Sequence, residues 1–156
     1  MKNISKNSGM SLVEVLIVVA LFGIIVGIVG FSFSGYRNSQ ALSNAENETV
    51  ALVNEARSRT LAGDSANAYG IHLEASRVVL FVGSSFIDTA TSNRVVSFDN
   101  TITMTSLSLA GGGSDVIFKK LTGGTDQYGS FVLQQISNPS NQKTININKL
   151  GSMSYN

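Results

Sequence analysis

The feature that most constrains this chain is an apolar run near its N-terminus. From Val15 to Phe31 the sequence has 17 residues without a charge, and Leu12 and Val13 extend the run on its N-terminal side. As an α-helix that rises about 1.5 Å per residue, residues 12–33 span roughly 33 Å, enough to cross the hydrocarbon core of a bilayer. The sequence therefore predicts a helix that must be covered by lipid or by other apolar surfaces.

The flanks of this run predict its orientation. Lys2 and Lys6 precede it, and residues 1–9 contain no acid. This bias favours a cytoplasmic N-terminus and an exported remainder. Ala20 is the only alanine in the run, and no Ala-x-Ala cleavage site follows it, so the run does not look like an ordinary cleaved secretory signal. Hydropathy alone is equally consistent with an uncleaved anchor that tethers a soluble domain.

Glu14 does not fit a plain anchor. A carboxylate deep in a membrane helix costs about 2.5–3.5 kcal/mol on insertion scales. The next basic residue along the chain is Arg37, too far away to serve as a partner within the same helix turn. We therefore expect a cation from elsewhere to pair with Glu14.

The residues around this acid resemble a known signal. The segment Gly9-Met10-Ser11-Leu12-Val13-Glu14, followed by the apolar run, resembles the class III signal of type IV prepilins and type II secretion pseudopilins. The resemblance implies that a prepilin peptidase cuts after Gly9 and that Met10, where Phe is commoner, becomes an N-methylated terminus. It also implies that Glu14 sets the register of filament assembly by meeting the α-amine of a neighbouring subunit.

This interpretation divides the chain into three parts. Residues 1–9 are a basic leader that is removed, residues 10–33 are a transmembrane or filament-core helix, and residues 34–156 hold the amphipathic second half of the helix and a β-rich head. The partners that the resemblance implies are the prepilin peptidase, other pilin or pseudopilin subunits, the inner-membrane assembly platform and, before assembly, membrane lipid. The expected location is the cytoplasmic membrane with an extracytoplasmic head, and a periplasmic or cell-surface filament after assembly.

Glycines interrupt the apolar run at Gly23, Gly27 and Gly30. Small residues four apart form a face for close helix packing. Each glycine also weakens a helix by about 1 kcal/mol relative to alanine. The sequence leaves two roles open, which are close packing and local melting of the helix in a filament.

The remainder of the chain predicts an α+β head. A stripe of apolar and small residues continues the helix to about Ala62, where Gly63 and Asp64 end it. This stripe comprises Leu42, Ala45, Thr49, Leu52, Val53, Ala56 and Thr60, whereas Arg37, Asn38, Glu46, Asn47 and Glu48 fall mostly outside it. We expect the second half of the helix to pack on an antiparallel sheet, as in the type IV pilin fold.

Short β-branched and aromatic runs between turn residues predict the strands. The expected strands are Tyr69–Glu74, Arg77–Val82, Arg94–Phe98, Thr101–Leu109, Asp115–Leu121, Ser130–Ile136 and Lys143–Asn148. The apolar phase changes between Met104 and Leu107, which predicts a bulge near Thr105 and Ser106. The order of these elements resembles the GspH/FimT-type minor pseudopilins and pilins. Some FimT-type members bind DNA through basic residues after a C-terminal glycine, but Gly151-Ser152-Met153-Ser154 has no arginine, which argues against DNA binding.

Catalytic and metal-binding signals are weak in this sequence. The chain has no cysteine, and His72 is its single histidine, so we expect a strand-face histidine and no metal cluster. Ser114-Asp115 and Thr125-Asp126 are expected to form turns, with a calcium loop as the alternative. Arg57 and Arg59 are interpreted as a solvated helix end, with a subunit or polyanion contact as the alternative. No catalytic residue and no cofactor is predicted.

Two classes of function remain open from the sequence. The first is a filament subunit of a type IV pilus-like or type II secretion system, most simply a minor component at the tip or in initiation. The second is a membrane-tethered binding module that never polymerises. A minor pilin for DNA uptake is a variant of the first class.

Overall fold

The computed structural model describes residues 10–63 and 67–155, without the side chains of residues 29–34. The predicted leader, including Gly9, lies outside the described residues. The chain divides into two compact units, the first ending at Arg37 and the second beginning at Asn38. The prediction of a long N-terminal helix followed by an antiparallel β-rich head, hence an α+β fold, is confirmed.

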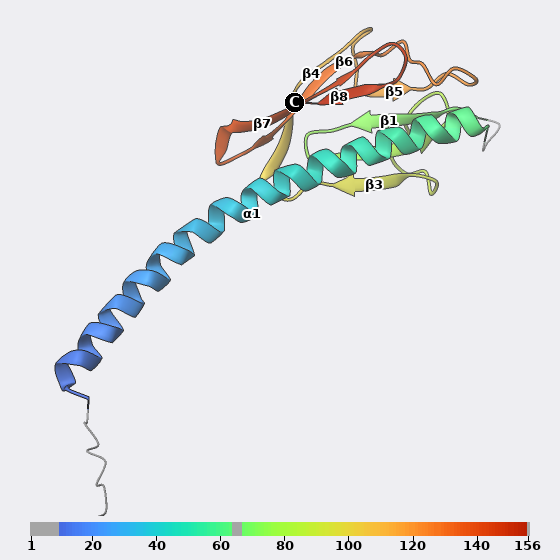
Figure 1. Ribbon diagram of the computed structural model, residues 1–156. Helices are drawn as coiled ribbons and strands as arrows, with labels where there is room; N and C mark the ends of the chain where they lie inside the picture. The colour runs from blue at the N-terminus through green and yellow to red at the C-terminus, as the bar shows by residue number, and fades with distance from the viewer. Residues whose placement is uncertain (1–9, 64–66, 156) are drawn as a thin grey trace, which may run out of the picture. The chain divides into compact units, whose positions relative to one another are not determined.

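Helix α1 (Leu12–Ala62) runs without a break through the end of the first unit and the start of the second (Figure 1). It begins where the Ser11 carbonyl accepts the N–H groups of Glu14 and Val15 at 3.0 and 3.2 Å. It ends as predicted at Ala62, because Gly63 adopts a φ of +67°, a conformation that glycine reaches without steric cost.

The head contains two four-stranded antiparallel sheets, where the sequence predicted one. The first has the order β3-β2-β1-β5, and its strands are β1 (Tyr69–Leu73), β2 (Arg77–Val82), β3 (Arg94–Ser97) and β5 (Asp115–Ile117). The second has the order β4-β6-β7-β8, and its strands are β4 (Ile102–Leu109), β6 (Gly129–Gln135), β7 (Asn138–Ile147) and β8 (Met153–Tyr155). Strands β3 and β5 are therefore the two edges of the first sheet.

The predicted bulge in β4 is confirmed. The pairing of β4 with β6 shifts register between Thr105 and Ser108, and Ser106 has a φ of +52°. The extra residue lets Met104 and Leu109 both face inward, although a strict alternation would place them on opposite faces.

One cluster of buried apolar side chains joins α1 to both sheets. Every member of the predicted helix stripe is buried. On the sheet side the cluster includes Ile71, Val78, Phe131, Leu133 and Ile145. The second half of α1 is thus covered by its own chain, and burial of its apolar stripe supplies the main stabilisation of the head.

Glu46 is an exception that the sequence pattern missed. It was placed outside the stripe, yet its side chain is only 9% exposed and its Oε2 lies 3.8 Å from Lys143 Nζ. Among the described residues, Glu46 Oε1 accepts no hydrogen bond. Lys143 shares a face of β7 with the buried Ile145 and Ile147, because residues two apart in a strand lie on the same side. Its cation therefore favours burial of the Glu46 carboxylate beside the sheet.

The strands depart most from the prediction in β5, β7 and β8, whereas the bounds of the other strands differ by at most one residue. The expected strand Asp115–Leu121 ends at Ile117, because Lys119 N–H donates to Gly124 O and Gly123 N–H to Lys119 O, closing a tight turn. Strand β7 begins at Asn138 rather than at Lys143, and the sequence gave no expectation of β8.

Thr60 offers a test of how α1 is tied to the first sheet. Its buried hydroxyl donates to Ala56 O at 2.8 Å and accepts the Tyr69 N–H at 3.1 Å, whereas buried Thr49 only donates to Ala45 O. Thr60→Val removes an acceptor for the first residue of β1, so we expect unfolding free energy to fall by about 1–3 kcal/mol. Thr49→Val should cost less than about 1 kcal/mol, because no N–H depends on that hydroxyl. Denaturant unfolding of both variants checks the difference, and equal costs would contradict it.

Candidate functional site

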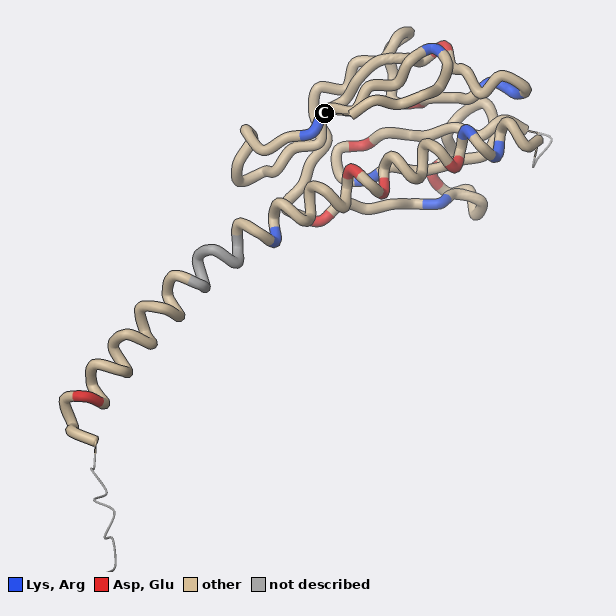
Figure 2. The backbone as a smooth tube through the Cα atoms, viewed as in Figure 1, with Lys and Arg blue, Asp and Glu red and all other residues tan. Residues whose placement is uncertain are grey.

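The first part of α1 presents an apolar surface on every side. All described side chains from Met10 to Ile28 are exposed, and the large apolar ones range from 45% exposed at Val15 to 76% at Leu12. In Figure 2 an acidic residue marks the start of this helix, and the turns that follow carry no charge. A helix that is apolar all round is stable only where lipid or protein covers it.

No helix among the described residues combines the length and hydropathy that a bilayer crossing demands. The predicted span of residues 10–33 overlaps residues 29–34, whose side chains lie outside the described set. Gly30, one of the three glycines of the run, falls in this segment.

Glu14 occupies a helix-capping position that the sequence analysis missed. Ser11 immediately precedes α1, its carbonyl accepts the N–H groups of Glu14 and Val15, and Glu14 is the third residue of the first helical turn. Ser followed three residues later by Glu is the capping-box pattern, and a carboxylate in the first turn also interacts favourably with the helix dipole. The spacing Ser11-x-x-Glu14 could have revealed this from the sequence. Stabilisation of the helix N-terminus is therefore a second reason for an acid at this position.

Met10 lies just outside the helix, four residues before Glu14, and its side chain is 68% exposed. Among the described residues, no ion pair or hydrogen bond engages the Glu14 side chain. The two residues that the sequence singled out for assembly therefore lie together at an uncovered helix end. Their pairing across subunits stays a prediction.

The glycines of the run are part of the continuous helix in this single chain. A Cβ placed on Gly23 or Gly27 would meet no atom within 4 Å, so neither glycine serves a close contact within the chain. Packing against a neighbour and melting in a filament both stay predictions.

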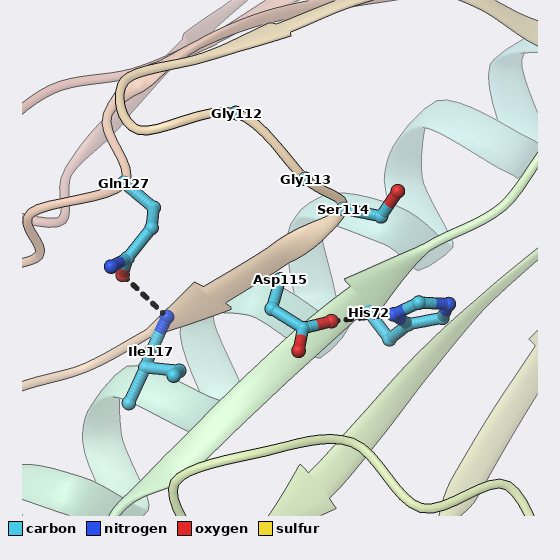
Figure 3. Close-up of a pocket in the computed structure, with 7 residues that line it drawn as sticks. All are labelled: His72, Gly112, Gly113, Ser114, Asp115, Ile117 and Gln127. Atoms are coloured by element: carbon cyan, nitrogen blue, oxygen red, sulfur yellow. Dashed lines mark hydrogen bonds and ion pairs between the residues drawn. The ribbon is translucent and has the colours of Figure 1, made fainter.

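His72 belongs to a closed polar network on the first sheet. It lines a pocket of about 400 Å³ together with Asp115 and Gln127 (Figure 3). Its Nδ1 lies 2.5 Å from Asp115 Oδ1, its Nε2 lies 3.4 Å from Glu74 Oε1, and its ring stacks on Phe86 at 3.9 Å. This matches the expected strand-face histidine. Among the described residues, no group of three or more metal-ligating side chains is placed to hold an ion.

The segment Thr125-Asp126, which the sequence predicted as a turn, makes its polar contacts within the chain. Thr125 Oγ1 accepts the Gln127 N–H at 3.1 Å, and Asp126 pairs with Lys119 at 2.6 Å. These contacts match the expected turn.

Arg57 corrects the interpretation of the helix end as a solvated one. Its Nε donates to Gly123 O at 3.2 Å and to Leu150 O at 3.3 Å, so it joins α1 to two turns of the head. Arg59 does behave as a surface residue, since it pairs with Glu55 one helical turn away. The signal for Arg57 was absent from the sequence, because its acceptors are backbone carbonyls far along the chain.

Arg77 links the His72 network to a neighbouring loop. It makes two hydrogen bonds of 2.8 Å to Glu74 and one of 2.9 Å to Asp88. The bonds from Arg77 lower the pKa of the Glu74 carboxyl below its usual range. A carboxyl with a depressed pKa stabilises the fold above its unfolded pKa, and this contribution is lost as the pH falls through the folded pKa.

We therefore predict a pH-dependent effect for Arg77→Gln. The variant should have a lower unfolding free energy than the parent at neutral pH, and the difference should shrink as the pH falls below about 4, near the ordinary pKa of Glu. Denaturant unfolding of the detergent-solubilised chain at a series of pH values measures this. A difference that stays constant from pH 7 to pH 3 would contradict the assignment.

Known proteins resemble this chain in two respects, its N-terminal sequence motif and its fold. Residues 4–30 match the family model of the prokaryotic N-terminal methylation motif. No curated protein matches the chain. Among solved structures, the fold is similar to the type IV minor pilin FimU of Pseudomonas aeruginosa in two crystal forms, each with a TM-score of 0.57 and 17% sequence identity. Each match covers 74% of this chain, and they cover 92% and 87% of the respective FimU chains. The chain therefore carries an N-terminal methylation motif, and its fold is similar to that of a type IV minor pilin.

Proposed function

We propose that this chain is a prepilin-like subunit that is cleaved after Gly9 and assembled into a type IV pilus-like or type II secretion pseudopilus filament. The observation that carries the proposal is the uncovered apolar surface from Met10 to Ile28, with a single carboxylate at its first turn. The match of residues 4–30 to the methylation motif supports processing at this end. The similarity of fold to a minor pilin supports a minor role at the tip or in initiation.

The mechanism follows from the two environments that the apolar helix needs. Before assembly, lipid covers it, with Lys2 and Lys6 holding the leader on the cytoplasmic side and the head outside. A membrane-embedded prepilin peptidase then cuts after Gly9. In the filament, other pilin helices replace lipid around the same surface, with the inner-membrane assembly platform as the site of transfer. The chain acts by assembly rather than by catalysis.

Cleavage also supplies the cation that Glu14 requires. The new α-amine at Met10 is largely protonated at neutral pH. Within a helix bundle of low dielectric, an isolated carboxylate is strongly unfavourable, whereas a carboxylate paired with an amine of a neighbour is tolerated. Pairing of Glu14 with such an amine would fix the axial register of one helix against the next.

Processing gives the first test of this proposal. Coexpression with a prepilin peptidase should shorten the chain by nine residues and expose Met10, with or without an N-methyl group. Gly9→Val should block the cut, because a β-branched side chain crowds the peptidase site. Intact-mass measurement and N-terminal sequencing check both outcomes, and a mature terminus at any residue other than Met10 would refute the proposed site.

Variants of Glu14 separate assembly from anchoring and from helix capping. Glu14→Gln keeps a capping-box residue but loses the charge, and Glu14→Leu removes the charge and its desolvation cost. Both should be cleaved and membrane-inserted, yet their yield in sheared filaments should fall at least tenfold, because breaking a buried ion pair costs about 3–5 kcal/mol.

Ser11→Ala is the matched control, since it weakens the cap and keeps the carboxylate. It should leave the filament yield within about twofold of the parent, because a lost cap costs only about 1 kcal/mol and the apolar surroundings still support the helix. Parental filament yield from Glu14→Leu would show that assembly does not depend on the Glu14 ion pair, whereas absence of the parent chain itself from sheared filaments would favour the tethered binding module. An equal loss from Ser11→Ala would assign Glu14 to capping.

A further inference from the structure

Two exposed leucines lie on a rigid part of the head. Leu121 is 92% exposed and Leu150 is 70% exposed. Leu121 also has a φ of +67°, a conformation that costs energy for any residue with a Cβ. A strained residue whose side chain gains no burial in its own chain points to a role outside it.

The turns that carry these leucines, residues 119–124 and 148–151, are fixed against each other. Arg57 Nε donates to carbonyls of both turns, and the Thr125 N–H donates to Lys149 O at 3.0 Å. Gly151 packs so closely that a Cβ there would collide with Gly123 O. We call this feature the leucine turn pair. Because it is already rigid, it would lose little conformational freedom on binding.

Basic residues surround the leucine turn pair. Lys119, Lys120 and Lys149 lie on the turns themselves, and Arg57 bridges them. Asp126, paired with Lys119, is the acid of the adjoining segment. A fitting partner therefore offers an apolar recess with an acidic rim.

The same chain carries such a recess at the opposite edge of the first sheet. A groove of about 390 Å³ lies between α1 and edge strand β3. Its apolar lining comes from Ala51, Leu52, Val95 and Val96. Its charged residues are Glu48 and Arg94, and because Arg94 pairs with Glu55 of α1, the carboxylates outnumber the cation at this groove. Val95 is 47% exposed, so the groove is accessible to another molecule.

The topology prevents these two features from meeting within one chain. The leucine turn at residues 119–124 follows β5, whereas the groove lies along β3, and these strands are the two edges of the sheet. We propose that the leucine turn pair of one copy docks in the β3 groove of a second copy. A contact between two different patches is heterologous, and repetition without closure produces a filament.

This inference rests on the proposed function, since it names a head-to-head contact within the same filament. A tip built from this chain would then contain at least two adjacent copies. The acidic rim at Glu48 would face the lysines of the neighbour, while the leucines would fill the apolar recess.

Cysteine cross-linking tests the contact, because the full chain has no cysteine of its own. Full-length Leu121→Cys and Val95→Cys are coexpressed with different tags and oxidised, and mixed dimers are measured in membrane and sheared-filament fractions. The control replaces Val95→Cys with Ile136→Cys, an exposed residue in the β6–β7 turn. We expect at least tenfold more mixed dimer from the test pair than from the control pair, and a loss of that excess when Glu48→Lys is added.

The outcomes distinguish this contact from the proposed function. An excess of mixed dimer in either fraction supports the contact, even if no filament forms and the proposed function fails. Filaments that depend on Glu14 but give no excess would overturn the contact and leave the proposed function standing. Equal cross-linking in the test and control pairs, in both fractions, also overturns it.

Discussion

The structure depends on covering one apolar helical surface. From Met10 to Ile28 the helix exposes apolar side chains around its whole circumference, and removal of this surface from water is strongly favourable. Such a surface demands lipid or other helices. On our proposal lipid covers this surface before assembly, and other pilin helices cover it in the filament. Removal of the leader creates the α-amine whose pairing with Glu14 sets the register between neighbouring helices.

The second half of the same helix is covered by the chain's own head. There a single stripe is apolar, and two sheets of the head cover it completely. Thr60 then connects the helix to β1, and Arg57 connects it to the turns after β5 and β7. The helix end is thereby fixed to both sheets.

Patterns that depend on local periodicity were predictable from the sequence. The helix stripe from Leu42 to Thr60, the stop at Gly63 and the bulge near Ser106 follow from spacing and glycine conformation alone. The placement of Glu46 was not predictable, because it depends on Lys143 from a strand nearly a hundred residues later. The same holds for Arg57, whose partners are backbone carbonyls brought near by tertiary packing. At the candidate site the sequence pattern predicted Met10 and Glu14, and the Ser11-x-x-Glu14 spacing at the start of the helix was readable there as well.

The most direct test of the account is a covalent link between Glu14 and an α-amine of another chain inside the filament. Sheared filaments that contain ¹⁵N-labelled copies of this chain among unlabelled subunits would be treated with a membrane-permeable carbodiimide and digested. Mass spectrometry would then identify the peptide joined to Glu14. We predict a labelled Glu14 peptide joined through an amide to the N-terminal peptide of an unlabelled subunit. Links confined to Met10 of the same chain, or filaments in which Glu14 forms no link to any amine, would contradict the account.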